Sequence, residues 1–217
     1  MGLDHSPLIV TDGLVYFLDA ANTRSYSGSG STAFGLVGPN GTLTNGTGYS
    51  SANSGSFFFD GTNDSLEFSS YTPDANTVNI WVNLKSLQDG PIIYVGDDTY
   101  NSTLWSWSFF AFSSLFYFRA TTTSQYFSEV PQFNTWINYT LIRNNGSNVS
   151  IAYKNGVFFG SISDSTTTTN PYPNMRIGRS AGNFANFNLG QVMIYNRALS
   201  AAEIVQNYNA TKRRYGL

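Results

Sequence analysis

The chain has 217 residues, of which 11% are charged and 16% aromatic, with a formal net charge of -2 at pH 7. It is too apolar for a disordered protein and has too few basic residues for a nucleic-acid surface. Cysteine is absent, which excludes disulfides, thiol catalysis and cysteine zinc sites. The length fits one domain over residues 1–217, and no apolar run is long enough to span a bilayer.

Period-2 patterns separated by turn residues recur along most of the chain and predict many short strands. Residues 1–12 are expected to form an N-terminal arm, and the polar, glycine-rich segment Asn22–Ser54 is expected to be a long, loosely structured loop. The predicted strands are Leu14–Leu18, Ser56–Phe59, Ser65–Phe68, Thr77–Leu84, Ile92–Val95, Trp105–Phe112, Leu115–Ala120, Trp136–Arg143, Val149–Tyr153, Val157–Phe159, Met175–Gly178 and Leu189–Tyr195.

Two of these patterns are especially clear. In Thr77–Leu84 the even-numbered residues are all apolar, which indicates a strand with the core on one side and mainly polar residues on the other. Asn155-Gly156 stands between two apolar runs and predicts a hairpin, because a type I′ turn needs a positive φ at both central residues.

One helix is predicted near the C-terminus, over residues 200–214. Ser200 and Glu203 have the spacing of a capping box, and Gly216 is a plausible stop. The basic residues Lys212 to Arg214 fit the last helical turn, where cations favour the negative end of the helix dipole. We interpret them as a solvated helix end, with a nucleic-acid patch as the alternative.

Several segments, in order, resemble the laminin-G-like branch of the concanavalin A-like lectin/glucanase superfamily. The resemblance implies an all-β, two-sheet antiparallel jelly-roll sandwich with a short C-terminal helix. The domain is also similar to structural proteins of tailed phages, which implies a place on a virion surface. The matching segments are Gly13–Ala20, Ser25–Tyr26, Gly28–Gly30, Phe57–Asp64, Val78–Val82, Trp136–Arg143, Tyr153–Gly156, Ile177–Arg179 and Gly190–Ile204.

The carboxylates argue against catalysis. Glycoside hydrolysis needs two carboxylates beside the scissile bond, and the glucanases of the superfamily carry two Glu on one strand. This chain has only three, Glu67, Glu129 and Glu203, and no two are close in sequence. The single histidine, His5, belongs to no recognisable Ser-His-Asp arrangement. We therefore expect no enzymatic activity.

One turn of the sequence offers candidate calcium ligands. The resemblance implies that such domains often hold one Ca²⁺, and Asp60, Asn63 and Asp64 offer hard oxygen ligands within one turn. The alternative is a hairpin turn whose side chains bond to their own backbone. The pair Asp97–Asp98 allows the same two interpretations.

The aromatic run Leu104–Phe118 has rings at positions of both parities. Core packing explains many of them, but one face can exceed what a single core buries, and exposed apolar patches usually mark interfaces. Trp105, Trp107 and Phe109 are thus candidates for subunit contact or for stacking on sugars, with core packing as the alternative.

These observations lead to a functional hypothesis. We expect a non-enzymatic structural protein on the surface of a tailed-phage virion, in the capsid or tail. It would contact other virion proteins, would be a homo-oligomer, and would touch cell-surface glycans but neither nucleic acid nor membrane. The alternatives are a secreted or surface lectin module that binds carbohydrate with Ca²⁺, and a hydrolase with an unfamiliar site.

Overall fold

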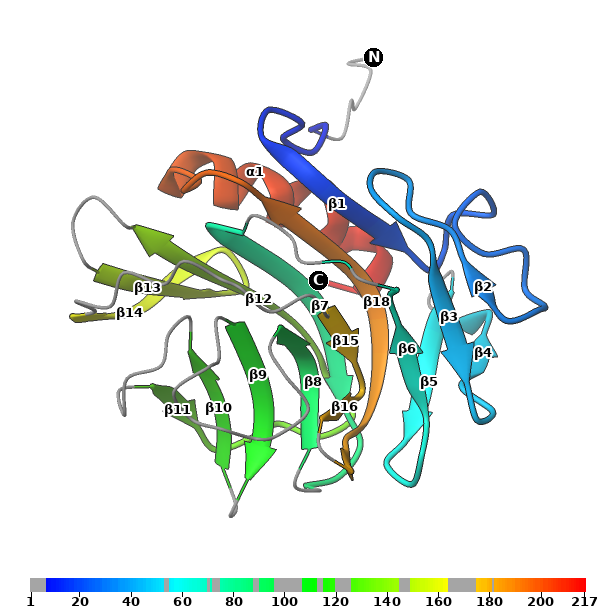
Figure 1. Cartoon of the computed structure of the whole chain (residues 1–217). Helices are drawn as coiled ribbons and strands as arrows, with labels where there is room; N and C mark the ends of the chain where they lie inside the picture. Colours follow the sequence, from blue (N-terminus) through cyan, green and yellow to red (C-terminus); the bar gives the residue numbers. More distant parts are fainter. Residues whose placement is uncertain are drawn as a thin grey trace.

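The computed structural model describes residues 7–52, 55–69, 71, 75–87, 90–95, 107–112, 115–119, 126–144, 149–163, 175–180 and 182–217. Two antiparallel sheets of eight strands face each other, with one α-helix outside them (Figure 1). The predicted all-β sandwich is therefore confirmed. No helix of the described residues is long and apolar enough to cross a membrane.

We call the first sheet sheet A. Its strand order is β14-β13-β12-β7-β18-β5-β4, and β1 also pairs with β18. The strands are β1 (Leu14–Asp19), β4 (Gly48–Ser50), β5 (Ser56–Asp60), β7 (Thr77–Leu84), β12 (Trp136–Asn144), β13 (Val149–Lys154), β14 (Val157–Ser163) and β18 (Asn186–Tyr195).

The second sheet, sheet B, has the order β11-β10-β9-β8-β15-β6-β3-β2. The outermost strands β11 and β14 lie at the same side of the sandwich (Figure 1). The strands of sheet B are β2 (Thr32–Ala33), β3 (Gly41–Thr44), β6 (Ser65–Glu67), β8 (Gly90–Val95), β9 (Trp107–Phe112), β10 (Leu115–Arg119), β11 (Phe127–Glu129) and β15 (Met175–Ile177). A small hairpin joins β16 (Arg179–Ser180) to β17 (Asn183–Phe184).

The expectation of a loosely structured loop at Asn22–Ser54 is wrong. This segment contains β2, β3 and β4, and β3 pairs with both β2 and β6. Leu43 on β3 is buried in the core, which fixes the register of this short strand. Strands of two to four residues carry too few alternating positions to be recognised from a sequence pattern.

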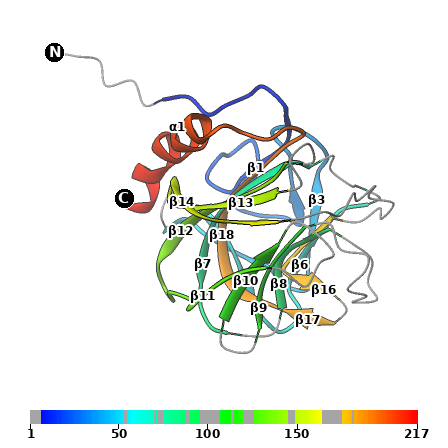
Figure 2. The same ribbon diagram turned by 90° about the vertical axis from the view of Figure 1, so that its left-hand side faces the viewer.

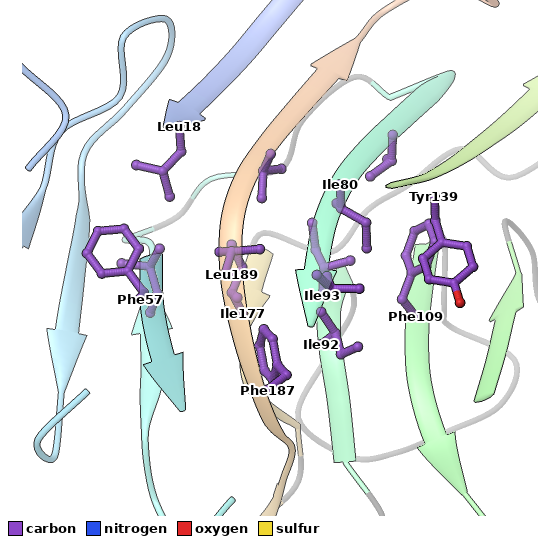
Figure 3. Close-up of a cluster of buried hydrophobic side chains, with 14 of the residues drawn as sticks. Leu18, Phe57, Ile80, Ile92, Ile93, Phe109, Tyr139, Ile177, Phe187 and Leu189 are labelled. Atoms are coloured by element: carbon purple, nitrogen blue, oxygen red, sulfur yellow. The ribbon is translucent and has the colours of Figure 1, made fainter. Parts of the chain in front are cut away.

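The main core fills the space between the two sheets. Figure 3 shows apolar side chains from both sheets meeting there, among them Leu18, Ile80 and Leu189 from sheet A and Ile93 and Ile177 from sheet B. Each of these side chains is at most 1% exposed. Because alternate residues of each strand point inward, the period-2 pattern of the sequence becomes this core.

Strand β7 is buried on both faces, unlike the half-buried strand predicted from its alternation. Helix α1 (Ala201–Thr211) and the 3₁₀ turn η2 (Lys212–Tyr215) cover the outer face of sheet A (Figure 2). The Trp81 ring stacks on Tyr215, with centroids 4.1 Å apart, and its Nε1 donates to the Thr211 hydroxyl at 2.8 Å. The helix thus supplies the burial that the alternation alone does not predict.

The predicted capping box is confirmed. The Ser200 hydroxyl accepts from the Glu203 backbone N–H at 3.3 Å, and the Glu203 carboxylate accepts from the Ser200 N–H at 2.8 Å. The α-helix ends at Thr211, and the chain leaves η2 through Gly216 with φ 78°. The region predicted as one helix over residues 200–214 is therefore an α-helix followed by a 3₁₀ turn.

The interpretation of the basic residues 212–214 as a solvated helix end is wrong for Arg214. Its guanidinium pairs with the carboxylate of Asp19 at the end of β1, and only 15% of the Arg214 side chain is exposed. It also donates to the carbonyl oxygens of Gly55 (2.7 Å) and Gly190 (3.2 Å). Arg214 therefore fastens η2 to β1 and β18.

The last residues of the predicted N-terminal arm are held beside the helix. The Val10 N–H donates to the Asn207 side-chain oxygen at 2.8 Å, and the Tyr195 hydroxyl donates to the Val10 carbonyl at 3.0 Å. The Asn207 amide donates in turn to the Tyr195 hydroxyl at 3.0 Å. Burial raises the pKa of Tyr195 to about 12, against the effect of the bond from Asn207.

We expect Asn207→Ala to lower the free energy of unfolding by about 2 kcal/mol, because it leaves the buried Val10 N–H without a partner and removes one of the hydrogen bonds of the buried Tyr195 hydroxyl. Urea denaturation would measure the change. Asn209→Ala, at a partly exposed position of the same helix, should change the free energy by less than about 0.5 kcal/mol. Equal effects at the two positions would contradict the role of the Asn207 network.

Candidate functional site

One exposed apolar surface of the described residues lies where the two sheets end. Here β14 and the residues around β11 expose large apolar side chains: Val157 is 68% exposed, Phe158 58%, Phe159 36% and Tyr126 48%. Phe127 is buried and meets Phe159 edge to face, with ring centroids 6.5 Å apart. We call Tyr126, Phe127, Val157, Phe158 and Phe159 the aromatic edge; it joins sheet A to sheet B.

The hairpin turn before β14 positions this edge. Asn155 and Gly156 have φ angles of 51° and 74°, which confirms the predicted turn. The Asn155 side chain accepts from the Asn138 N–H at 2.9 Å, and the Asn155 N–H donates to the Asn138 carbonyl at 2.8 Å. A Cβ on Gly156 would lie 3.0 Å from the Tyr208 ring, so the turn is fixed between β12 and α1.

A β-bulge then directs the two phenylalanines to different sides. The register between β13 and β14 shifts, so that Phe158 lies opposite Tyr153 while Gly160 lies opposite Ala152, with Phe159 as the extra residue. The Phe158 ring meets Tyr153 on the outer side of sheet A, and Phe159 meets Phe127 at the seam between the sheets. The edge therefore presents aromatic rings on two adjoining surfaces.

A largely buried ion pair between β11 and β13 lies beside the aromatic edge. Glu129 on β11 forms an ion pair with Lys154 on β13 at 2.6 Å and also accepts from the Tyr139 hydroxyl on β12. Only 12% of the Glu129 side chain and 20% of the Lys154 side chain are exposed. Burial, together with the bond to Glu129, raises the pKa of Tyr139 well above its usual range. The phenol therefore stays protonated and links sheet A to sheet B.

The other two glutamates also form ion pairs. Glu67 accepts from the Nε of Arg176 at 3.2 Å and of Arg179 at 2.5 Å, on the far face of sheet B from the core. Glu203 pairs with Arg197 at 2.6 Å, and this contact together with the bond from the Ser200 N–H lowers the pKa of Glu203 to about 2. Each glutamate of the chain thus has at least one cationic partner.

The Glu203 pair gives a pH prediction. A carboxylate whose pKa falls from 4.5 to about 2 on folding adds stability above pH 4.5 and loses it as the pH falls toward 2. Glu203→Gln should therefore lower the free energy of unfolding by about 1 kcal/mol at pH 7, a value reduced for solvent screening. The difference between wild type and variant should disappear near pH 2. If denaturation curves gave the same difference in the free energy of unfolding between the two proteins from pH 7 to pH 2, the lowered pKa of Glu203 could not be its cause.

Comparison with known proteins supplies the family. The Laminin_G_3 family model, described as the concanavalin A-like lectin/glucanases superfamily, matches residues 59–205, more than half of the chain. The chain belongs to the concanavalin A-like lectin/glucanases superfamily. A search of curated protein sequences gave no significant match.

Solved structures share the fold of this concanavalin A-like domain at low identity. They include Trypanosoma rangeli sialidase with the inhibitor DANA, at 14% identity and a TM-score of 0.69, over 94% of this chain and 35% of the sialidase. Domain 4 of a Geobacillus stearothermophilus extracellular arabinanase, in complex with arabinotriose, matches at 15% identity and a TM-score of 0.67, over 90% of this chain and 98% of that domain. The botulinum neurotoxin type G receptor binding domain matches at 16% identity and a TM-score of 0.64, over 91% of this chain and 51% of the toxin chain. The chain thus spans about a third of the sialidase.

The candidate calcium ligands form a self-contained turn in this concanavalin A-like domain. Asp60 accepts from the Thr62 N–H at 2.7 Å, and the buried Asp64 accepts from the Asp60 N–H at 3.0 Å. Burial raises the pKa of Asp64, opposed by that bond. The Asn63 carbonyl accepts from the Asn45 amide at 2.9 Å. These bonds to the backbone of the same turn are the ones expected from the turn interpretation, and the Ca²⁺ interpretation stays a prediction.

No group of three acidic, histidine or cysteine side chains in the described ranges could hold a metal ion. Asp97–Asp98 lie outside these ranges.

Of the three candidate contact residues in the aromatic run, the structure describes the side chain of Phe109 alone. Trp105 and the side chain of Trp107 lie outside what the structure describes. Phe109 is completely buried and lies beside Phe116 and Tyr139, so its interpretation as a contact residue is wrong and the core alternative is confirmed for this position. Sequence reasoning did not single out the exposed rings of Tyr126, Phe158 and Phe159.

Proposed function

We propose that this concanavalin A-like domain is a non-enzymatic carbohydrate-binding module whose aromatic edge stacks against sugar rings. The observation that carries the proposal is the exposure of Phe158 and Phe159 on β14, the outer strand of sheet A. Exposed apolar patches mark interaction sites, and flat aromatic rings suit the apolar faces of sugars. A similar arabinanase domain in complex with arabinotriose and a similar toxin receptor binding domain support the proposal.

The ion pairs of the glutamates support the non-enzymatic part. A glycosidase acid needs a raised pKa and a second carboxylate about 5–10 Å away. Glu203 has the opposite shift, to about 2, and serves the helix cap. Glu67 lies between two arginines, and Glu129 is paired with Lys154 behind the edge. The three glutamates therefore stabilise the fold through ion pairs and the helix cap.

A glycan array would test the proposal, with the wild type beside the double variant Phe158→Ala/Phe159→Ala. We expect the wild type to bind a subset of glycans without cleaving them and the double variant to bind at least about fivefold more weakly, since each lost ring contact is worth about 0.5–1.5 kcal/mol. Phe58→Ala is the matched control, because Phe58 is 41% exposed on β5, five strand positions away in sheet A.

A flat array for the wild type, or equal binding by the double variant, would refute the proposal. The same array in EDTA separates the calcium-dependent lectin alternative. We expect binding to persist there, because the carboxylates of Asp60 and Asp64 bond to their own turn.

We also propose that the domain acts on the surface of a tailed-phage virion, in the capsid or tail, as a homo-oligomer. The resemblance of the sequence to phage structural proteins supports this setting, and many copies on one particle would strengthen weak glycan contacts through avidity. Mass spectrometry of purified particles would test it. Absence of the protein from the particles would contradict the virion location. A monomer in light scattering would contradict the homo-oligomer.

A further inference from the structure

Four buried polar atoms beneath the C-terminal turn have no hydrogen-bond partner among the described residues. They are the Tyr215 hydroxyl, Trp136 Nε1, Asn83 Oδ1 and Gln191 Oε1. Each of these residues is less than a tenth exposed. Buried polar groups in folded proteins almost always have a partner, because burying one without a hydrogen bond costs about 1–3 kcal/mol.

Three of the four groups lie on neighbouring strands, on the outer face of sheet A. Trp136 and Asn83 are direct cross-strand partners on β12 and β7, and Gln191 on the next strand, β18, is the partner of Trp81. Neighbouring strands are about 4.8 Å apart and alternate residues of one strand about 6.7 Å apart. These three groups therefore lie on three adjacent strands, with Gln191 one alternate position further along than Asn83 and Trp136.

Tyr215 covers these positions from η2. Its ring lies 4.1 Å from Trp81 and 4.7 Å from Trp136, measured between centroids. Its hydroxyl lies over Gly190, where an added Cβ would be only 2.2 Å away. Glycine at this position, next to Gln191, lets the phenol approach the backbone of β18. The fourth polar atom, the Tyr215 hydroxyl, therefore lies against β18 at the residue next to Gln191.

The chemistry of the four atoms is complementary to water. The Trp136 indole can only donate, the two amide oxygens can only accept, and the Tyr215 hydroxyl can do either. Buried waters typically make about three hydrogen bonds to such groups. We propose that the C-terminal turn encloses an internal water site, in which at least one ordered water bridges Tyr215 to the side chains of Trp136, Asn83 and Gln191.

Arg214 contacts the same part of β18 as Tyr215. It donates to the Gly190 carbonyl at 3.2 Å and pairs with Asp19, so the two consecutive residues Arg214 and Tyr215 meet β18 at the same glycine. The water site explains how the last turn of the chain packs on a sheet face that carries polar side chains. It is independent of the proposed glycan binding at the aromatic edge.

The sign of a stability change tests the water site. If water bridges the Tyr215 hydroxyl, Tyr215→Phe removes a hydrogen bond and the equilibrium constant for unfolding rises, by about tenfold in urea denaturation. If the hydroxyl is buried without a partner, the same change relieves its desolvation cost and the constant falls. An unchanged or lower constant would overturn the proposal. Gln191→Met should shift the constant in the same direction as Tyr215→Phe, and the opposite direction would count against it.

Tyr208→Phe is the matched control, because it removes a phenol hydroxyl from a partly exposed ring of the same aromatic cluster. We expect it to leave the constant unchanged; an equal rise would overturn the assignment to Tyr215. A crystal structure at a resolution that shows ordered water gives the direct measurement. Electron density for a water within hydrogen-bond distance of the Tyr215 hydroxyl and one of the other three atoms is expected. Its absence would refute the proposal.

Discussion

Trp81→Ala is expected to lower the free energy of unfolding by about 4 kcal/mol. Replacing a fully buried Trp by Ala costs about 3–5 kcal/mol through lost burial and the cavity left behind. The Trp81 ring stacks on both Tyr215 and Tyr208, and its Nε1 is bonded to Thr211. The substitution therefore removes the Trp81 contacts of α1 and η2 with sheet A, and urea denaturation would measure the loss.

The control for Trp81→Ala is Phe158→Ala, which removes an aromatic ring that is 58% exposed. This change should cost less than about 1 kcal/mol, because most of the ring is already in water. Comparable losses at the two positions would show that the helix is not held by Trp81. The small expected loss also means that the edge variants remain folded for binding assays.

Arg214→Ala should lower the free energy of unfolding by about 3 kcal/mol. Removing one partner of a buried ion pair leaves an uncompensated charge, which costs about 3–5 kcal/mol. The lower end of that range applies, since 15% of the Arg214 side chain and 18% of the Asp19 side chain are exposed. The carbonyls of Gly55 and Gly190 lose a donor as well.

The neighbouring residue provides the comparison for Arg214. Arg213 is exposed, and Arg213→Ala should change the stability by less than about 0.5 kcal/mol. A double-mutant cycle with Asp19→Ala should give a coupling energy of at least about 1 kcal/mol. Additive effects of the Arg214 and Asp19 substitutions would mean that the pair contributes nothing.

Long alternating segments made the fold predictable from the sequence. Thr77–Leu84 and Leu189–Tyr195 each fall within a strand of sheet A, and the spacing of Ser200 and Glu203 indicated the start of α1. The pattern could not show that the second face of β7 is buried. That burial depends on α1 and η2, which lie more than a hundred residues further along the chain.

The polar residues on that second face find partners that no local pattern reveals. The side-chain amides of Asn79 and Asn138 exchange hydrogen bonds at 3.1 and 3.0 Å, and Asn79 also donates to Thr140 at 2.6 Å. These residues are about sixty positions apart, and only the pairing of β7 with β12 brings them together. In the sequence, a buried polar layer of this kind has the same pattern as a solvent-facing strand.

The candidate site was the least predictable part. The aromatic run made Phe109 a candidate contact residue, but its position in the alternation of β9 places its ring in the core. The exposed rings of Phe158 and Phe159 belong to a short apolar run without alternation, at the outer strand of a sheet. Three successive apolar residues cannot all face the core, which is the signal that could have identified this edge.

Chemical-shift mapping would locate the glycan-binding surface of the domain. A glycan that binds on the array would be titrated into the isotope-labelled protein while backbone amide shifts are recorded and the glycan is analysed for cleavage. We expect the perturbed amides to be those of Tyr126–Glu129 and Val157–Ser163 and the glycan to stay intact. Perturbations centred on another surface, such as the turn at Asp60–Asp64, or release of cleaved sugar would contradict this expectation.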